Sequence, residues 1–421
     1  MNLLPYVEIA GDLPGPAWLR DLRVAAARRG VELGVPSSEE EAWRYSPIRD
    51  LDLESRAPST ATGGAAALPG ELVDSIGDRA ATVVLDNGRI TSVEVDPLLE
   101  AKGVRVVRVA DTDESELLAT VTAGASDLFA ELSAALAPEP LLIDIPAGVV
   151  VEAPVVIASG ASAPDAAVYT RVIVRAGENS EVRVADLRTS APVGQLVVPH
   201  VDLVVGPSAR LGYVEVQEHA RTTWQIGQQV SRVAQAGQLR SVVAAFGGAY
   251  ARLRTECRLD GRGASGDLLA AYFADGDQTL DFRTFQQHVA PDTTSNLLYV
   301  GVGAGTSRSV YTGTIRVEHE ARGTDAVQTN RNVKLSDEAW AESVPNLEIY
   351  NNEVKCAHAS AVGPVDEEQR FYLESRGVPP EVAERLIVAG FFEAVLAKLP
   401  VPALEAPLRA DIDDKLDQRE R

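Results

Sequence analysis

The stretch QLVVPHVDLVVGPSARLGYVEVQ, residues 195–217, contains two short runs in which apolar residues alternate with other residues. Such alternation is typical of β-strands, and Gly206 between the two runs is a turn signal. Similar runs, rich in β-branched residues, begin near Pro140 and continue for roughly 200 residues with few long helical patterns among them. The middle of the chain is therefore predicted to consist almost entirely of strands.

Turn residues recur through this region about 30 residues apart, which is a spacing typical of repeat folds. They form two interleaved series, Gly177, Gly206, Gly237, Gly266 and Gly323, and Gly247, Gly276, Gly305 and Ser336. Chance spacing of a common residue is the alternative explanation. If the period is real, each repeat is one coil with two turns, and its strands hydrogen-bond to those of the next coil. We therefore predict a mainly β protein with a right-handed parallel β-helix, or solenoid, as its core.

Helical patterns flank the predicted core. Residues 16–30 and 125–137 have an amphipathic period, and Ser38 followed by glutamates predicts a further helix that ends by Ser46. Asn87-Gly88 predicts a β-hairpin turn. We divide the chain into a mostly helical N-terminal region (1–138), a parallel β-helix core (139–363) and a C-terminal helical region (364–421).

The C-terminal region contains two predicted helices, the first ending at Gly377 and the second starting near Pro379. The second helix carries an apolar face formed by Val382, Leu386, Phe392 and Val395. Two helices are too few to bury such faces against one another. They are expected to pack either on the end of the solenoid or on another protein, and the sequence does not decide between these alternatives.

The composition excludes several classes of partner. The formal net charge of −22 would repel a phosphate backbone, so no nucleic-acid partner is expected. No apolar run is long enough to span a membrane, and the N-terminal residues do not have the pattern of a secretory signal. Two cysteines cannot form a disulfide framework, and a cytoplasmic location is therefore expected.

Cys356 and His358 are the sharpest candidates for a chemical site. Residues i and i+2 of a strand point to the same face, and thiolate with imidazole suits iron, zinc or iron–sulfur species. Two ligands do not complete a tetrahedral site, so further ligands would have to come from elsewhere, and an ordinary packed thiol is the alternative. Cys257 and the other four histidines are expected to have structural or surface roles, although His319 beside Glu320 could contribute to a metal site.

Three segments carry a resemblance to a known family. The stretch PNLEIYNNEVKCAHASAVGPVDEEQRFYLESRGVPPEVAERLIVAGFFEAVL, residues 345–396, closely resembles the C-terminal region of the SufB/SufD family of iron–sulfur cluster assembly proteins. AWRYSPI (42–48) and AVQTNRNVKLSDEA (326–339) also resemble family motifs. The pattern K-C-x-H is similar to the SufD branch, although Ala359 and Ser360 stand where many relatives have Gly-Ala.

The resemblance implies a non-enzymatic scaffold subunit of the SUF iron–sulfur cluster assembly complex. It implies pairing with a SufB-like subunit through the ends of the two β-helices and docking of a SufC-like ATPase, which alone binds ATP, on the C-terminal helices. Val382, Leu386, Phe392 and Val395 would then be partner-binding residues. Cys356 and His358 would face the SufB interface, where a nascent iron–sulfur cluster is shared and is not stably bound by this chain alone. A β-helix enzyme acting on polysaccharide and a homodimer formed by the isolated chain remain alternatives.

Overall fold

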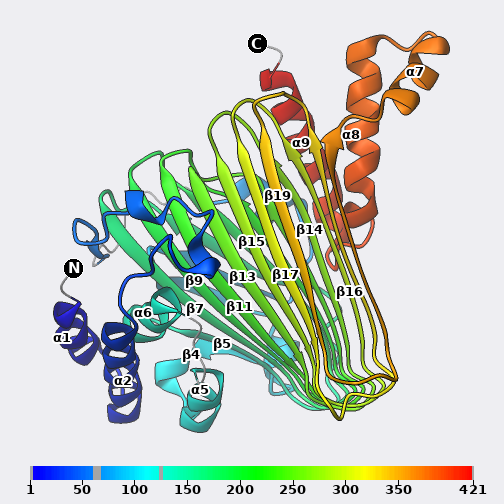
Figure 1. Cartoon of the computed structure of the whole chain (residues 1–421). Helices are drawn as coiled ribbons and strands as arrows, with labels where there is room; N and C mark the ends of the chain where they lie inside the picture. Colours follow the sequence, from blue (N-terminus) through cyan, green and yellow to red (C-terminus); the bar gives the residue numbers. More distant parts are fainter. Residues whose placement is uncertain (1–2, 60–67, 123–126, 420–421) are drawn as a thin grey trace.

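The computed structural model describes residues 3–59, 68–122 and 127–419, and a long stack of parallel strands dominates it (Figure 1). From β5 (Leu141–Ile145) to β20 (Lys355–Pro364), successive strands alternate between two ten-stranded sheets, so two strands make one coil. About eight coils result, with helices before and after them. The predicted parallel β-solenoid with helical flanking regions is confirmed.

Sheet A follows the order β19-β17-β15-β13-β11-β9-β7-β5-β4, and β1 pairs with β7 beside it. Its bounds are β1 Ala57–Pro58, β4 Arg105–Arg108, β5 Leu141–Ile145, β7 Ala166–Ala176, β9 Gln195–Val205, β11 Thr223–Val233, β13 Tyr250–Leu259, β15 Thr279–His288, β17 Arg308–Val317 and β19 Trp340–Ile349. Sheet B follows the order β20-β18-β16-β14-β12-β10-β8-β6-β2-β3. Its bounds are β2 Ala81–Asp86, β3 Arg89–Val95, β6 Val155–Ala161, β8 Glu181–Ser190, β10 Arg210–Glu218, β12 Gln238–Ala245, β14 Ser265–Ala274, β16 Thr294–Gly303, β18 Asp325–Lys334 and β20 Lys355–Pro364.

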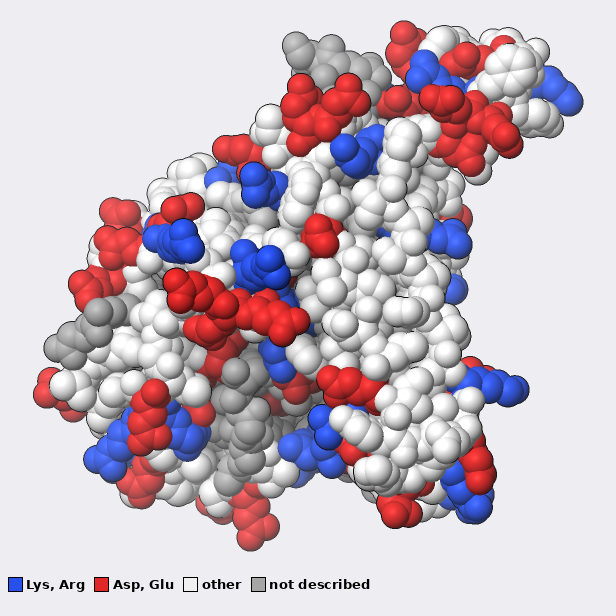
Figure 2. Space-filling view, in the orientation of Figure 1, with Lys and Arg blue, Asp and Glu red and all other residues white. Residues whose placement is uncertain are grey.

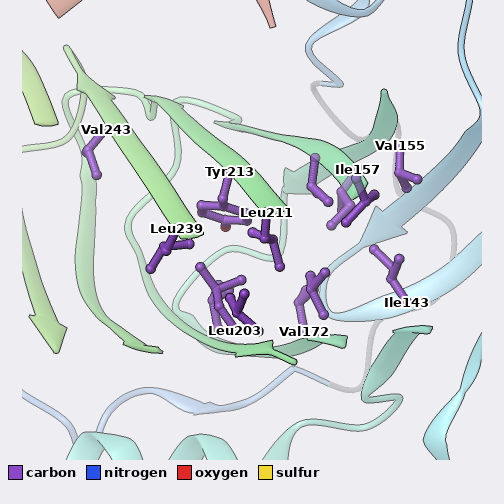
Figure 3. Packing of buried hydrophobic residues seen from close by; sticks show 14 of the residues in the cluster. Ile143, Val155, Ile157, Val172, Leu203, Leu211, Tyr213, Leu239 and Val243 are labelled. Atoms are coloured by element: carbon purple, nitrogen blue, oxygen red, sulfur yellow. The ribbon is translucent and has the colours of Figure 1, made fainter. Parts of the chain in front are cut away.

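The apolar core lies between the two sheets, because alternate side chains of every strand point inward. Figure 3 shows Val172 and Leu203 from sheet A meeting Ile157 and Leu211 from sheet B. All four side chains are at most 2% exposed. Removing this continuous apolar stack from water is the main force that holds the coils together.

The recurring glycines occupy turns with one exception. Gly276 (φ +57°) and Gly305 (φ +63°) adopt the left-handed conformation at equivalent turns of successive coils, which glycine adopts without a steric penalty. Gly266 instead lies inside β14, where a β-carbon would approach the Sγ of Cys257 to 2.8 Å. Its place in the periodic series therefore reflects close packing between the sheets rather than a turn.

The N-terminal region combines helices with strands that extend both sheets. Its helices are α1 Leu4–Asp12, α2 Ala17–Leu33, α3 Gly70–Ser75, α4 Pro97–Glu100, α5 Ser115–Thr122 and α6 Leu128–Leu136. The hairpin predicted at Asn87-Gly88 is confirmed: β2 and β3 join there, both turn residues have positive φ, and β2 pairs in parallel with β6. The first coil is thus covered by strands from the N-terminal region.

The helix predicted to end by Ser46 is wrong, because this segment forms only the short 3-10 turns Glu41–Trp43 and Ile48–Asp50. The Trp43 ring is buried beneath the Arg252 guanidinium, 3.9 Å from its carbon to the ring centroid. The Ser46 hydroxyl lies 2.7 Å from the Tyr250 hydroxyl. These contacts with sheet A outweigh the local helix-start signal, as tertiary packing often does.

The C-terminal region contains α7 Glu367–Ser375, α8 Pro380–Leu396 and α9 Glu405–Arg419. Helix α7 projects away from the solenoid and has no buried residue, whereas α8 and α9 pack on the outer face of sheet B (Figure 1). Helix α9 was not predicted, although Leu408, Ile412 and Leu416 recur every four residues and are all buried. Within the described part of the chain, no helix is long and apolar enough to cross a bilayer.

Candidate functional site at the last coil

Strands β19 and β20 form the last coil, and each is the final strand of its sheet. Cys356 pairs in register with Ala326 of β18, and His358 pairs with Gln328. Both partners on β18 are fully buried, and side chains at paired positions of parallel strands point to the same side of the sheet. Cys356 and His358 therefore face the interior side of the solenoid, as the i, i+2 spacing predicted.

The interior side is open at this coil, because among the described residues no further strand stacks on β19 or β20. Cys356 is consequently half-buried and His358 is exposed. The Cys356 thiol contacts the small apolar cluster that contains Ile315 and Ala326. Burial, and next the Asp325 carboxylate, raise the pKa of Cys356, so the isolated chain holds the thiol in its protonated form. A metal or a charged partner group would have to displace that proton.

The donors of the last coil form an incomplete ligand set. No group of three or more histidine, cysteine, aspartate or glutamate side chains is placed to hold a metal ion anywhere in the described ranges. One thiol and one imidazole on one face of β20 can supply half of a tetrahedral set. The arrangement suits a site that a second chain completes.

The free edges of β19 and β20 form a surface that we call the terminal edge. Each strand is ten residues long, and its outer row of backbone groups has no strand partner in the described part of the molecule. Val362 and Ile349 are 42% and 40% exposed there. Figure 2 shows few charged side chains over the last coils, at the right of the view, between charged clusters above and below. A long, weakly charged edge of this kind is a template for pairing with another chain.

A second surface lies beside the terminal edge, in a groove of about 770 Å³ between α7, α8 and the end of β20. Its lining includes the apolar Leu373, Ile387 and Phe391, together with Asp366 and Glu368 at the start of α7. Apolar groups thus line a depression that has two carboxylates at one end, which suits a partner with basic and apolar groups.

The four residues predicted to bind a partner separate into two pairs. Val382 and Leu386 are 43% and 52% exposed, so they remain available. Phe392 and Val395 are fully buried within the apolar cluster that α8 forms with sheet B, so they serve the fold of this chain instead. The two pairs separate because a helix packed on a sheet buries only the side that faces the sheet. Phe392 and Val395 lie on that side of α8, and Val382 and Leu386 do not.

Sequence reasoning missed two exposed aromatic residues, Phe371 and Tyr372 of α7. They are 73% and 57% exposed, and Tyr372 also lines the groove. Two adjacent aromatic residues on a short helix point in directions about 100° apart, so a single narrow packing face cannot bury both, and that pattern was the available signal. Together with Val382 and Leu386 they form an exposed set that we call the helical docking surface.

Cys257 and three of the remaining histidines are buried, and His319 is exposed beside the turn between β19 and β20. His200, His219 and His288 are buried and hydrogen-bonded to Asp202, Gln225 and Thr293 respectively. His319 is exposed and its ring packs against Tyr350, with 5.3 Å between the centroids. Burial raises the pKa of Cys257 to about 12, which agrees with the structural role predicted for it.

Comparisons with known proteins show the family to which the chain is similar. Residues 157–391 match the family described as "SUF system FeS cluster assembly, SufBD core domain". The chain is 33% identical over 396 residues to an iron-sulfur cluster assembly SufBD family protein of Mycobacterium tuberculosis, an alignment that covers 91% of this chain and 90% of the relative. It is 25% identical over 415 residues to the iron-sulfur cluster assembly protein SufD of Bacillus subtilis, covering 95% and 94%.

Proposed function

Because the chain belongs to the SufBD family of SUF iron–sulfur cluster assembly proteins, we propose that it is a SufD-like, non-enzymatic scaffold subunit of the cytoplasmic assembly complex. The observation that carries this proposal is the open last coil, where Cys356 and His358 face an interior that no further strand of the described chain covers. A SufB-like chain would continue the stack and bring the missing ligands. The nascent cluster is then the cargo of a shared interface and not a resident cofactor of this chain.

The terminal edge supports the pairing part of the proposal. Backbone groups along β19 and β20 would gain hydrogen bonds with the partner, and Val362 and Ile349 would lose their exposure to water. Such contacts cost no rearrangement of this chain, because its strands are already extended and held by β17 and β18.

The helical docking surface supports the second part of the proposal, which is the docking of an ATPase. Leu386 and Phe371 are large apolar side chains with most of their area in water, and the groove beside them is bordered by acids. We propose that a SufC-like ATPase covers this surface and that ATP is bound by that partner alone. Closure of two ATPases would pull on α7 and α8, which lie next to the terminal edge, and would change how the two β-helices meet.

The pairing is tested by co-expression of this chain with SufB-like and SufC-like partners of the same host, followed by purification through a tag on this chain. Val362→Asp should abolish recovery of the SufB-like subunit, because a buried unpaired carboxylate at the edge is strongly unfavourable. Val327→Asp is the matched control, since Val327 is 39% exposed on β18, one strand in from the edge, and points to the outer face of sheet B between the inward Ala326 and Gln328. Recovery of the partner with both variants would contradict the proposal.

The ATPase contact has its own pair of variants. Leu386→Ala should reduce recovery of the SufC-like ATPase while the SufB-like subunit is retained. Leu33→Ala is the control, because Leu33 is 53% exposed on α2, at the opposite end of the molecule. Equal recovery of the ATPase with Leu386→Ala and with the unchanged chain would rule out this part of the docking surface.

A homodimer is the second candidate assembly, and the same terminal edge favours it, because a second copy offers the same free strands. Sedimentation of the chain with and without a SufB-like partner separates the two states. We expect any homodimer to be displaced by the partner. No particular observation favours the polysaccharide enzyme, and turnover of a pectin-type substrate by the pure chain would contradict the scaffold assignment.

A further inference from the structure

The interior of the solenoid holds buried polar side chains at several positions. Valine, leucine and isoleucine fill much of the early coils (Figure 3), but β8 and β10 bury an ion pair of Arg188 with Asp186 and Glu215. In the last coils, the inward positions of β18 hold Gln328, Asn330 and Asn332. All three are at most 5% exposed. A buried polar group that lacks a hydrogen bond costs about 1–3 kcal/mol, so the partners of these amides need to be identified.

The two asparagines are satisfied within the chain. The Asn330 amide nitrogen donates to the Tyr272 hydroxyl at 3.0 Å and to the Tyr299 carbonyl at 3.2 Å. The Asn332 amide nitrogen donates to Asn330 Oδ1 at 2.8 Å, and Asn332 Oδ1 accepts from the Tyr272 hydroxyl at 2.8 Å. Each amide atom of these two asparagines thus has at least one hydrogen-bond partner within the chain.

Gln328 differs from them. It is fully buried, yet neither of its amide atoms makes a well-aligned hydrogen bond among the described residues. Its amide nitrogen and the Tyr311 hydroxyl both border the space that a β-carbon on Gly313 would fill. Burial raises the pKa of Tyr311, and contacts with Thr284 and Gln328 oppose that shift. The nitrogen therefore lies against the phenol, and the amide oxygen Oε1 is left as an unused acceptor.

His358 is the residue that stacks on Gln328 in the next coil, in register and on the same face. Ser360 and Val362 stack on the two asparagines, so among these positions His358 is the residue that stacks on the glutamine with the unused acceptor. A histidine that ligates a metal normally donates its second ring N–H to an acceptor, which fixes the tautomer and the ring orientation. Gln328 has the chemistry and the position for this role.

We propose that Gln328 is a positioning residue for His358: its Oε1 accepts one imidazole N–H and directs the other ring nitrogen, as a lone-pair donor, to the open end of the solenoid. The inference rests on the proposed function and names the residue that would prepare its ligand. Tyr311, held by Thr284 through a 2.9 Å hydroxyl contact, keeps the glutamine amide oriented, and Gly313 provides the space in which both groups meet.

The test is the tautomeric state of His358 in the isolated, metal-free chain, measured by nitrogen-15 imidazole NMR after selective histidine labelling. The chain has five histidines, and loss of one signal set in His358→Ala assigns the residue. We expect a single dominant tautomer in the unchanged chain. Gln328→Met, which keeps the length of the side chain and removes the amide, should shift His358 to the mixed tautomers of a free imidazole. Gln328→Glu, whose carboxylate also accepts a hydrogen bond, should keep the single tautomer when the signals are read at a pH at which the imidazole is neutral.

Gln286→Met is the matched control. Gln286 is also buried with both amide atoms unpartnered, but it lies on β15 of the other sheet and does not stack on His358. Gln286→Met should leave the His358 tautomer unchanged, even if it lowers the stability of the chain as much as Gln328→Met does. If the unchanged chain already shows mixed tautomers at His358, or if Gln328→Met leaves its signals unaltered, the inference is overturned. This readout needs no iron and no partner, so its failure is distinct from failure of the proposed function.

Discussion

Phe392 of α8 stacks on Phe273 of β14, with ring centroids 6.4 Å apart and planes inclined by 24°. Both rings are fully buried, so this contact holds the C-terminal helices on the outer face of sheet B. The sequence pattern placed Phe392 on an apolar face of α8, and the family resemblance assigned that face to a partner. The contact shows which side of α8 belongs to the fold, and it leaves the opposite side, with Leu386, exposed to solvent.

This division predicts opposite outcomes for two phenylalanines. Phe392→Ala should lower the free energy of unfolding by about 3–5 kcal/mol, because it leaves a cavity beneath α8. Phe371→Ala, at a position 73% exposed, should leave stability nearly unchanged and instead weaken binding of the ATPase. Denaturant unfolding and co-purification measure the two effects. Equal stability losses in both variants would contradict the assignment of the two faces.

The thiol of Cys356 should react slowly with alkylating reagents near neutral pH. Its pKa lies above the ordinary value of 9.0, because of burial and then Asp325, and only the thiolate is nucleophilic. The rate of iodoacetamide labelling should therefore keep rising above pH 9, and Asp325→Asn should increase the rate at pH 8. Cys257 is the internal control, since its burial should prevent labelling until the chain unfolds. Rapid labelling of Cys356 at pH 7 would show that the thiol is already activated.

The attachment of α9 should weaken as pH rises. Glu218, at the end of β10, hydrogen-bonds Asp411 of α9, and burial together with that second acid raises the pKa of Glu218 to about 8. Lys415 and Glu71 also face the pair, and Lys415 opposes the shift. The folded state therefore retains a proton that the unfolded chain loses near pH 4.5. The free energy of unfolding must therefore fall as the pH rises from about 4.5 to about 8, by at most about 1.4 kcal/mol per pH unit, and level off at higher pH.

Thermal unfolding at pH 6 and at pH 8.5 measures this dependence. Glu218→Gln keeps a neutral hydrogen-bonding group and should flatten the profile, so that the variant exceeds the unchanged chain in stability at pH 8.5. The exposed Glu178→Gln should leave the profile as it is. If the thermal stability of the unchanged chain rose from pH 6 to pH 8.5, the proposal that Glu218 and Asp411 retain a proton in the folded state would be contradicted.

The fold could be predicted because its rule is local and repeated. Alternating apolar positions and turn residues in each coil indicate the same architecture many times over, and Asn87-Gly88 specifies its hairpin by the positive φ that both residues adopt. The failures have tertiary causes. Trp43 packs beneath Arg252, and this contact prevents a local helix. Phe392 packs on sheet B because its ring stacks on Phe273, which lies more than 100 residues earlier in the chain.

The candidate site could be predicted only in part. The spacing of Cys356 and His358 placed both on one face of a strand, and the register confirms this geometry. Gln328 could not be recognised, because its importance depends on two facts absent from the sequence: which residue stacks above it and which of its amide atoms lacks a partner. Pairings between coils are long-range, so a residue 30 positions away is invisible to patterns of short period.

The central claim is that the open last coil supplies half of a shared cluster site, and the iron and sulfide content of the assembled complex tests it most directly. The complex of this chain with its SufB-like and SufC-like partners should be reconstituted with the unchanged chain, with His358→Ala and with the exposed control His319→Ala. We predict intact complexes in all three cases, with iron and acid-labile sulfide largely lost only in His358→Ala. Unchanged iron and sulfide in an intact His358→Ala complex would contradict the account.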